Sequence, residues 1–203
     1  MTSETVSLKA FNRWGTEGVA VTDLGLKNYI SLDAKMAPKT GARYAGNRFH
    51  KSKVFIVERL INKLMNSGHK SKKHTKSSGR FTGKGATALK IVEGSLEVIE
   101  KKTNQNPIMV LVKAIENAAP REEIISIEYG GARYPKAVEC APQRRIDVTL
   151  RFMTQGAYTK SFNSRKSVVN ALADEIIAAY NMSLTSSAIA KKQELERQAD
   201  SSR

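Results

Sequence analysis

The spacing of apolar residues constrains the fold of this chain most, because it follows a helical period almost throughout and strict alternation in one segment. Apolar residues three or four positions apart are typical of amphipathic helices. This pattern predicts helices over residues 53–65, 86–101, 107–119, 142–155, 164–180 and 186–200. The sequence therefore predicts a mainly α protein, a bundle of about six helices.

The alternating segment interrupts this helical pattern. Ile125, Ile127 and Tyr129 alternate with polar residues, Gly130 and Gly131 suit a tight turn, and a second apolar strand returns to residue 140. We predict a β-hairpin over residues 123–140. Because an isolated two-stranded ribbon is marginally stable in water, it must either pack on the helices or protrude and be ordered by a partner. Cationic and aromatic residues near its tip favour protrusion: Arg133, Tyr134 and Lys136.

Residues 1–50 lack a clear period, and we predict an irregular N-terminal extension that drapes on a partner, followed by a helical domain over 51–203. The end of this extension interleaves Arg43, Arg48 and Lys51 with Tyr44 and Phe49. Such a mixture suits phosphates together with stacked bases, although an ordinary surface linker would have the same composition.

Residues 68–85 are rich in Lys, Ser and Gly and contain no acidic residue, which predicts a mobile basic loop. Its lysines, Lys72 and Lys73 among them, suit contact with RNA, but a nuclear localisation signal has the same composition. We favour RNA contact.

Two of the predicted helices carry cations where phosphate could bind. In the helix over 142–155, Arg144 and Arg151 lie opposite the apolar face. Ser164 is a good N-cap for the next helix and would place Arg165 and Lys166 in its first turn. Cations there oppose the helix dipole unless an anion binds the free amides, so either a phosphate site or an exposed, unpaired pair of cations is consistent with the sequence.

The charge of the chain indicates its class of partner. Thirty-four Lys and Arg face 19 Asp and Glu, a net charge of +15, which calls for a polyanion such as nucleic acid. A membrane is not expected, since no apolar run approaches the ~20 residues that span a bilayer. The first residues also lack the features of a signal peptide, so we expect a cytosolic protein.

The sequence offers no catalytic constellation. Cys140 is flanked by small apolar residues and is expected to be a buried hydrophobe, and the histidines lack neighbouring metal ligands. Asp174 and Glu175 point about 100° apart on a helix, and the glycine-rich stretch 79–85 lacks the spacing of a phosphate-binding loop. We therefore expect neither an enzyme nor a metal or cofactor.

Several short strings together resemble the universal small-subunit ribosomal protein S-seven family. The similarity covers most of the chain, and residues 8–32 resemble the N-terminal extension of its cytosolic eukaryotic members. The strings, in order, are Arg43-Tyr44-Ala45, Ile56-Val57-Glu58-Arg59-Leu60, Asn106-Pro107, Pro120-Arg121-Glu122, Arg144-Arg145, Leu172-Ala173-Asp174-Glu175 and Glu194-Leu195-Glu196-Arg197.

This resemblance implies a helical bundle with one protruding β-ribbon that binds the 3′ major domain of small-subunit rRNA and helps to assemble the head of the subunit. The ribbon would lie beside the exit-site tRNA and the mRNA path, with neighbouring ribosomal proteins close by. The protein would be cytoplasmic, with nuclear and nucleolar passage during assembly. The rRNA contacts implied by the resemblance are Arg43, Arg48, Lys51, Arg144, Arg145, Arg151, Arg165 and Lys166. Lys72 and Lys73 are added to the expected rRNA contacts from the composition of the basic loop. The implied tRNA and mRNA side comprises Arg133, Tyr134, Lys136 and Arg203.

Two other classes of function fit part of the pattern. A helical body with a β-arm is also how architectural proteins enter the DNA minor groove, but this arm lacks a clear apolar wedge. A helical protein-interaction module would leave the charge of +15 unexplained. Preference for folded rRNA over duplex DNA would separate the first alternative from the ribosomal one.

Overall fold

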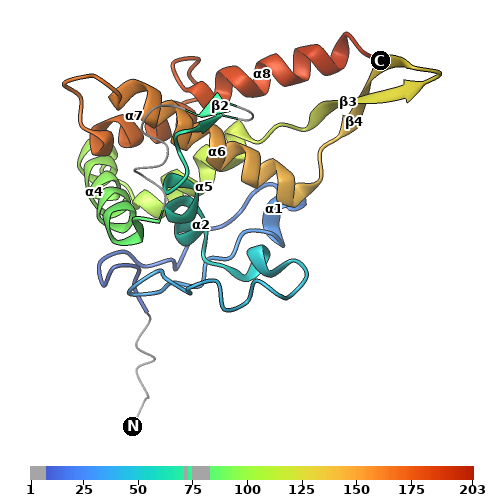
Figure 1. Cartoon of the computed structure of the whole chain (residues 1–203). Helices are drawn as coiled ribbons and strands as arrows, with labels where there is room; N and C mark the ends of the chain where they lie inside the picture. The colour runs from blue at the N-terminus through green and yellow to red at the C-terminus, as the bar shows by residue number, and fades with distance from the viewer. Residues whose placement is uncertain (1–7, 71–72, 75–82) are drawn as a thin grey trace.

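The structure, a computed structural model, describes residues 8–70, 73–74 and 83–203. It confirms a mainly α bundle with a β-hairpin (Figure 1). The elements in chain order are α1 (Leu24–Lys27), a 3-10 turn (His50–Lys53), α2 (Ile56–Leu64), β1 (His69–Lys70), β2 (Lys73–His74), α4 (Gly85–Thr103), α5 (Pro107–Ala118), β3 (Glu122–Tyr129), β4 (Ala132–Glu139), α6 (Pro142–Ser161), α7 (Val168–Tyr180) and α8 (Ser187–Asp200).

Each predicted helix is present, and the bounds of two differ from the prediction by four residues or more at one end. Helix α6 continues to Ser161 because Ala157 and Tyr158 are also buried. Helix α7 starts only at Val168, where the Ser167 side chain accepts the Asn170 N–H, so the predicted cap at Ser164 is wrong. The Ser164 hydroxyl instead accepts the Lys166 N–H at 3.2 Å in the preceding turn. Arg165 and Lys166 therefore lie before the helix and not in its first turn.

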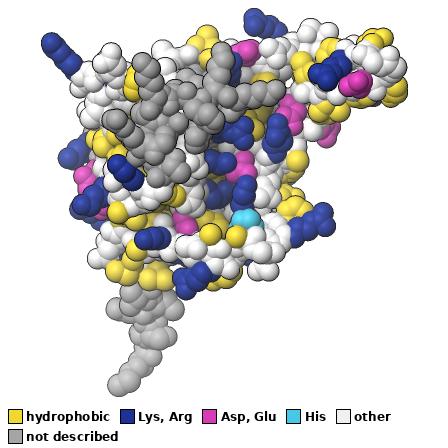
Figure 2. Space-filling view, in the orientation of Figure 1, with side chains coloured by type: hydrophobic (Ala, Val, Ile, Leu, Met, Phe, Trp, Pro, Cys, Tyr) yellow, Lys and Arg dark blue, Asp and Glu magenta, His cyan; other side chains and the backbone are white. Residues whose placement is uncertain are grey.

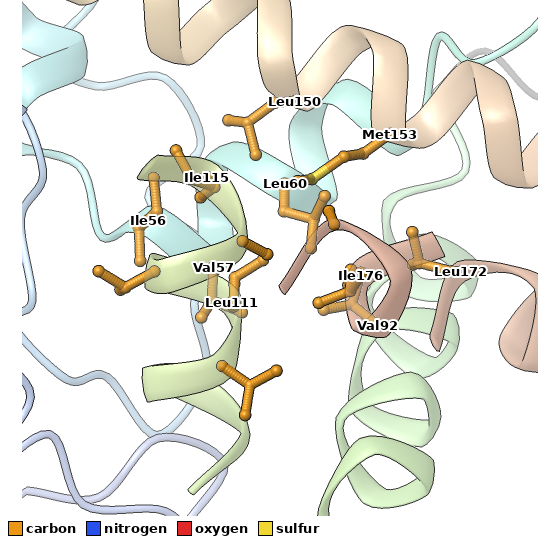
Figure 3. Close-up of a cluster of buried hydrophobic side chains, with 14 of the residues drawn as sticks. Ile56, Val57, Leu60, Val92, Leu111, Ile115, Leu150, Met153, Leu172 and Ile176 are labelled. Carbon is orange, nitrogen blue, oxygen red and sulfur yellow. The ribbon is translucent and has the colours of Figure 1, made fainter. Parts of the chain in front are cut away.

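The core lies where the longer helices meet. Apolar side chains from α2, α4, α5, α6 and α7 point toward one another in its centre (Figure 3): Ile56, Val57, Leu60, Val92, Leu111, Ile115, Leu150, Met153, Leu172 and Ile176. All ten side chains belong to residues that are fully buried. Each such side chain contributes roughly 1.5–3 kcal/mol on burial, so this cluster holds the helices in a fixed arrangement.

The N-terminal extension is irregular, as predicted, and part of it packs on the protein's own helices. Ala10, Trp14, Leu26 and Ile30 are buried in the same core. The Trp14 indole N–H donates to Glu100 at 3.0 Å. The extension and the helices therefore share one hydrophobic core.

Strands β3 and β4 form the predicted antiparallel hairpin, which projects from the body (Figure 1). Gly130 and Gly131 form its turn with φ of +56° and +83°, values that favour glycine. Helix α8 runs along the base, where the Glu196 carboxylate accepts the Arg121 N–H at 3.1 Å. The base is thus held by the protein and the tip extends beyond it. In the predicted basic loop, β1 and β2 pair as a two-residue ladder.

Candidate nucleic-acid interface

Four cations lie near one another where α2 meets α6, and three of them pair with a single carboxylate. Asp147 of α6 lies 3.0 Å from Lys51 Nζ, 3.3 Å from Arg59 and 4.0 Å from Lys63 Nζ. Arg59 and Lys63 are four residues apart on α2, as Asp147 and Arg151 are on α6, so each pair lies on one helix face. The charge of Arg151 acts on Lys63. The cluster, called here the Asp147 cluster, carries three more positive charges than negative ones.

Burial and charge act in opposite directions on the groups of this cluster. Burial by itself raises the pKa of Asp147, but the hydrogen bond from Lys51 and the charges of Lys63 and Arg59 hold that pKa below its usual value. Burial lowers the pKa of Lys63 and Arg59, and Asp147 opposes this effect. A phosphate would supply the negative charge that this cluster lacks.

The segment before α2 extends this basic surface. Thr40 is held by the buried Glu58, whose carboxylate accepts the Thr40 N–H at 2.7 Å and its hydroxyl at 2.6 Å. The Arg43 Nε then donates to the Thr40 carbonyl at 3.1 Å. Arg48 is exposed and its guanidinium lies 5.0 Å from the centre of the Phe49 ring, a cation–π contact.

A groove of about 870 Å³ runs between this segment, α2 and the start of α4 and includes Lys51, Arg59 and Asp147 in its lining. Figure 2 shows Lys and Arg side chains gathered on the face of the molecule over α2 and α6, with few acidic side chains among them. We call this surface, from Arg43 to the Asp147 cluster, the basic face. Glu58 and Arg59 were not singled out as site residues in the sequence, because nothing there shows that a buried acid anchors the basic segment.

Arg144 and Arg145, which the resemblance places on rRNA, have carboxylate partners within the protein. Arg144 Nε donates to both oxygens of Glu123, at 2.6 and 2.8 Å, which raises the pKa of Arg144. Arg145 is largely buried and donates to Asp23 at 2.9 Å and to the Pro120 carbonyl at 3.1 Å. Arg145 therefore joins the N-terminal extension to the base of the hairpin.

The other predicted rRNA residues are dispersed. Lys166 pairs with Asp174 at 2.5 Å, whereas exposed Arg165 has no ion pair with any residue that the structure describes. Lys72 lies outside the described residues, and Lys73 is described only through its backbone in β2. The structure thus brings Lys51 and Arg151 together in the Asp147 cluster and holds Arg43 at Thr40, which lines the same groove as Lys51, but it does not bring together the whole predicted set.

The hairpin residues form a second, separate surface. Tyr134 is paired with Ile127 and Lys136 with Ile125, so these four side chains lie on one face of the ribbon. Arg133 faces Glu128 at 3.4 Å. Arg203 lies at the base of the hairpin, where it donates to Glu122 at 2.7 Å, and not at the tip.

The described residues favour binding over covalent chemistry. Burial, together with the charge of Glu123, raises the pKa of Cys140, so its thiol is a poor nucleophile. Within residues 8–70, 73–74 and 83–203 no group of three or more His, Cys, Asp or Glu is placed to hold a metal ion. Within the same residues, no helix has the length and hydropathy needed to cross a bilayer.

Comparison with known proteins agrees with this picture. The family described as "Ribosomal protein S7p/S5e" matches residues 26–203. The chain is 52% identical to "Small ribosomal subunit protein uS7" of Nanoarchaeum equitans, over 98% of this chain and 100% of that protein. It is 47% identical to the protein of the same name from Methanosphaera stadtmanae, over 97% and 99%. It is 46% identical to the protein of that name from Archaeoglobus fulgidus, over 97% of this chain and 95% of that protein. The chain therefore belongs to the ribosomal protein S7p/S5e family, a family of structural, non-enzymatic proteins.

Proposed function

We propose that this protein is a structural constituent of the small ribosomal subunit and that it binds the 3′ major, or head, domain of the rRNA through its basic face. The excess of three positive charges in the Asp147 cluster is the observation that carries this proposal. Cations on the rigid helices α2 and α6 release counterions from RNA when they bind its phosphates. The fixed spacing of the two helices would then select the shape of folded rRNA over other polyanions.

This proposal is tested by the salt dependence of binding. Arg48 and Arg151 are exposed and have no ion pair with any described residue, so Arg48→Ala with Arg151→Ala should leave the fold intact. We expect the slope of log affinity for head-domain rRNA against log salt to fall in magnitude by roughly 1.4–1.8, the effect of two lost phosphate contacts. Lys101→Ala with Arg197→Ala, on exposed positions of α4 and α8, removes the same charge elsewhere and is the matched control.

If both double variants lowered the salt slope equally, only the net charge of the protein would matter for rRNA binding. That result would contradict the proposal that the basic face is the binding site. Duplex DNA serves as the competing ligand, because an architectural DNA-binding protein would bind it about as well as rRNA. Sedimentation of cell lysate gives the complementary measurement. A core ribosomal protein should migrate with small subunits and polysomes after a high-salt wash, whereas confinement to free fractions would overturn the assignment.

We further propose that the hairpin lies beside the exit-site tRNA and the mRNA, with neighbouring head and platform proteins around it. The support is geometric: the tip projects from the body and exposes Tyr134, which is 57% exposed. The hairpin carries Glu122, Glu123, Glu128 and Glu139 against only Arg133 and Lys136, so stacking on Tyr134 rather than charge would provide the contact. Loss of exit-site tRNA crosslinks in Tyr134→Ala ribosomes is the expected result.

Cytoplasmic localisation on the ribosome follows from this proposal. Nuclear and nucleolar passage during assembly, implied by the resemblance to eukaryotic members, stays a prediction for a source cell that has a nucleus. The relatives named above are archaeal proteins. Microscopy of the tagged protein in its own cell would test this point.

A further inference from the structure

A second, smaller pocket of about 300 Å³ lies where the ends of α2 and α6 meet the starts of α4 and α7. Its walls are mostly apolar and include Ile91, Val168 and two aromatic rings. Met65 lines both this pocket and the groove of the basic face. The two hollows therefore adjoin, and a strand that follows the groove can reach the pocket.

The two aromatic rings of this pocket are stacked on each other, and one of them is half exposed. Tyr158 and Phe162 have ring centres 5.5 Å apart and planes inclined by 25°. Tyr158 is buried, whereas Phe162 is 51% exposed. A half-exposed phenylalanine stacked on a fixed second ring is a platform on which a flat, aromatic ligand can continue the stack.

The charged side chains among the described residues of the lining are both cationic, Lys84 and Lys166. Arg165 precedes Lys166 in an exposed turn, and Asn163 lines the pocket with an amide that can donate and accept hydrogen bonds. Asp174 neutralises Lys166 in part, at 2.5 Å, but does not line the pocket. An apolar slot with cations and one amide at its edge suits a flat base attached to a phosphate.

We propose that this pocket binds a single unpaired nucleotide of RNA. Its base stacks on Phe162, its Watson–Crick or Hoogsteen edge faces Asn163, and its phosphate lies near Lys84 and Arg165. The volume is at the lower end of the range for small-ligand sites, roughly 300–1,000 Å³, which suits one nucleotide and not a helix. This inference rests on the proposed rRNA binding and adds to it a site that splayed bases, which proteins read by stacking, can enter.

The test is the affinity of the full-length protein for head-domain rRNA. We expect Phe162→Ala to weaken binding roughly 5- to 150-fold, the usual effect of one lost base stack, while the salt slope stays unchanged. Phe162→Trp keeps the platform and should restore binding. Leu184→Ala is the matched control, since Leu184 is a similarly exposed apolar residue, 64% exposed, in the turn before α8. Ultraviolet crosslinking followed by mass spectrometry should place an RNA adduct on the peptide that contains Phe162.

Wild-type affinity of the Phe162→Ala variant would overturn the proposal, as would failure of Phe162→Trp to restore binding. A lowered melting temperature of Phe162→Ala with unchanged RNA affinity would show that another part of the chain fills the pocket, and would overturn it equally. Failure of the proposed function itself looks different, because the wild-type protein would then show no preference for rRNA and no response to Arg48→Ala with Arg151→Ala.

Discussion

At the scale of single residues, Asp147 is a carboxylate whose loss should affect the fold through charge. Its removal leaves Lys51, Arg59 and Lys63 facing one another without a counter-charge. We expect Asp147→Asn to lower the free energy of unfolding by about 2–3 kcal/mol, less than for a fully buried pair because Asp147 is 16% exposed. Urea denaturation measures this, with the exposed Asp200→Asn as control. If the two variants have the same free energy of unfolding, the stability of the Asp147 cluster does not depend on its carboxylate.

The same residue sets a pH dependence. Because the folded-state pKa of Asp147 lies below the ordinary 3.8, its contribution is complete well above that value and is lost as pH falls through the folded-state pKa. Asp23 behaves in the same way. Burial by itself raises its pKa, but the hydrogen bond from Arg145 and other contacts lower the pKa by more than burial raises it, so the net pKa lies below the usual value. We expect the wild-type free energy of unfolding to fall below about pH 4, and less steeply in Asp147→Asn. Parallel curves for the two proteins would contradict the assignment.

At the scale of elements, the contact between α6 and α8 depends on one glycine. A Cβ on Gly156 would lie 2.6 Å from Ser187 Oγ and 2.8 Å from Ser187 Cβ. We expect Gly156→Ala to destabilise the protein by roughly 1–3 kcal/mol through this clash, although alanine favours a helix. Gly94→Ala in α4 meets Val169 only at 3.4 Å and should be neutral or stabilising by up to about 1 kcal/mol. Thermal denaturation measures the stability of both variants. If Gly156→Ala and Gly94→Ala lost the same stability, the close contact between Gly156 and Ser187 would not be the cause.

Elements were predictable where one local signal determined them. Asn106 and Pro107 define the start of α5, and Gly130–Gly131 defines the hairpin turn, because each signal acts within a few residues: the Asn106 side chain accepts the Ile108 N–H, and the two glycines adopt positive φ. The start of α7 was misplaced because Ser164 and Ser167 are equally good caps in isolation, and only the tertiary structure selects between them. The basic face was predicted in part. The cations could be read from composition, but the partners of Arg144 and Arg145 are distant in sequence and appear only in the folded chain.

At the scale of the whole molecule, the N-terminal extension should behave as part of the folded body. Trp14 is 5% exposed in the common core, and Glu116 accepts hydrogen bonds from both Thr22 groups, N–H at 2.5 Å and hydroxyl at 2.6 Å. We expect Trp14→Ala to cost about 3–5 kcal/mol and deletion of residues 1–32 to cost more. Calorimetry on both proteins measures this. An unchanged melting temperature after the deletion would support the sequence-based prediction of an extension that drapes on a partner and not on the protein's own core.

The net charge of +15 gives the free protein and its RNA complex opposite responses to salt. In the free protein the basic face repels itself, and salt screens that repulsion, so the melting temperature should rise between about 0.02 and 0.3 M salt. In the complex the same cations replace counterions on RNA, so affinity should fall steeply over the same range. Asp147→Asn should enlarge both responses to salt, because this substitution removes a negative charge and leaves more unpaired positive charge in the basic face. Its melting temperature should rise more steeply with salt than that of the wild type, and its RNA affinity should fall more steeply. A variant that is destabilised equally at all salt concentrations would have lost packing rather than charge balance, and the basic face would then not be the site at which the protein's excess charge meets RNA.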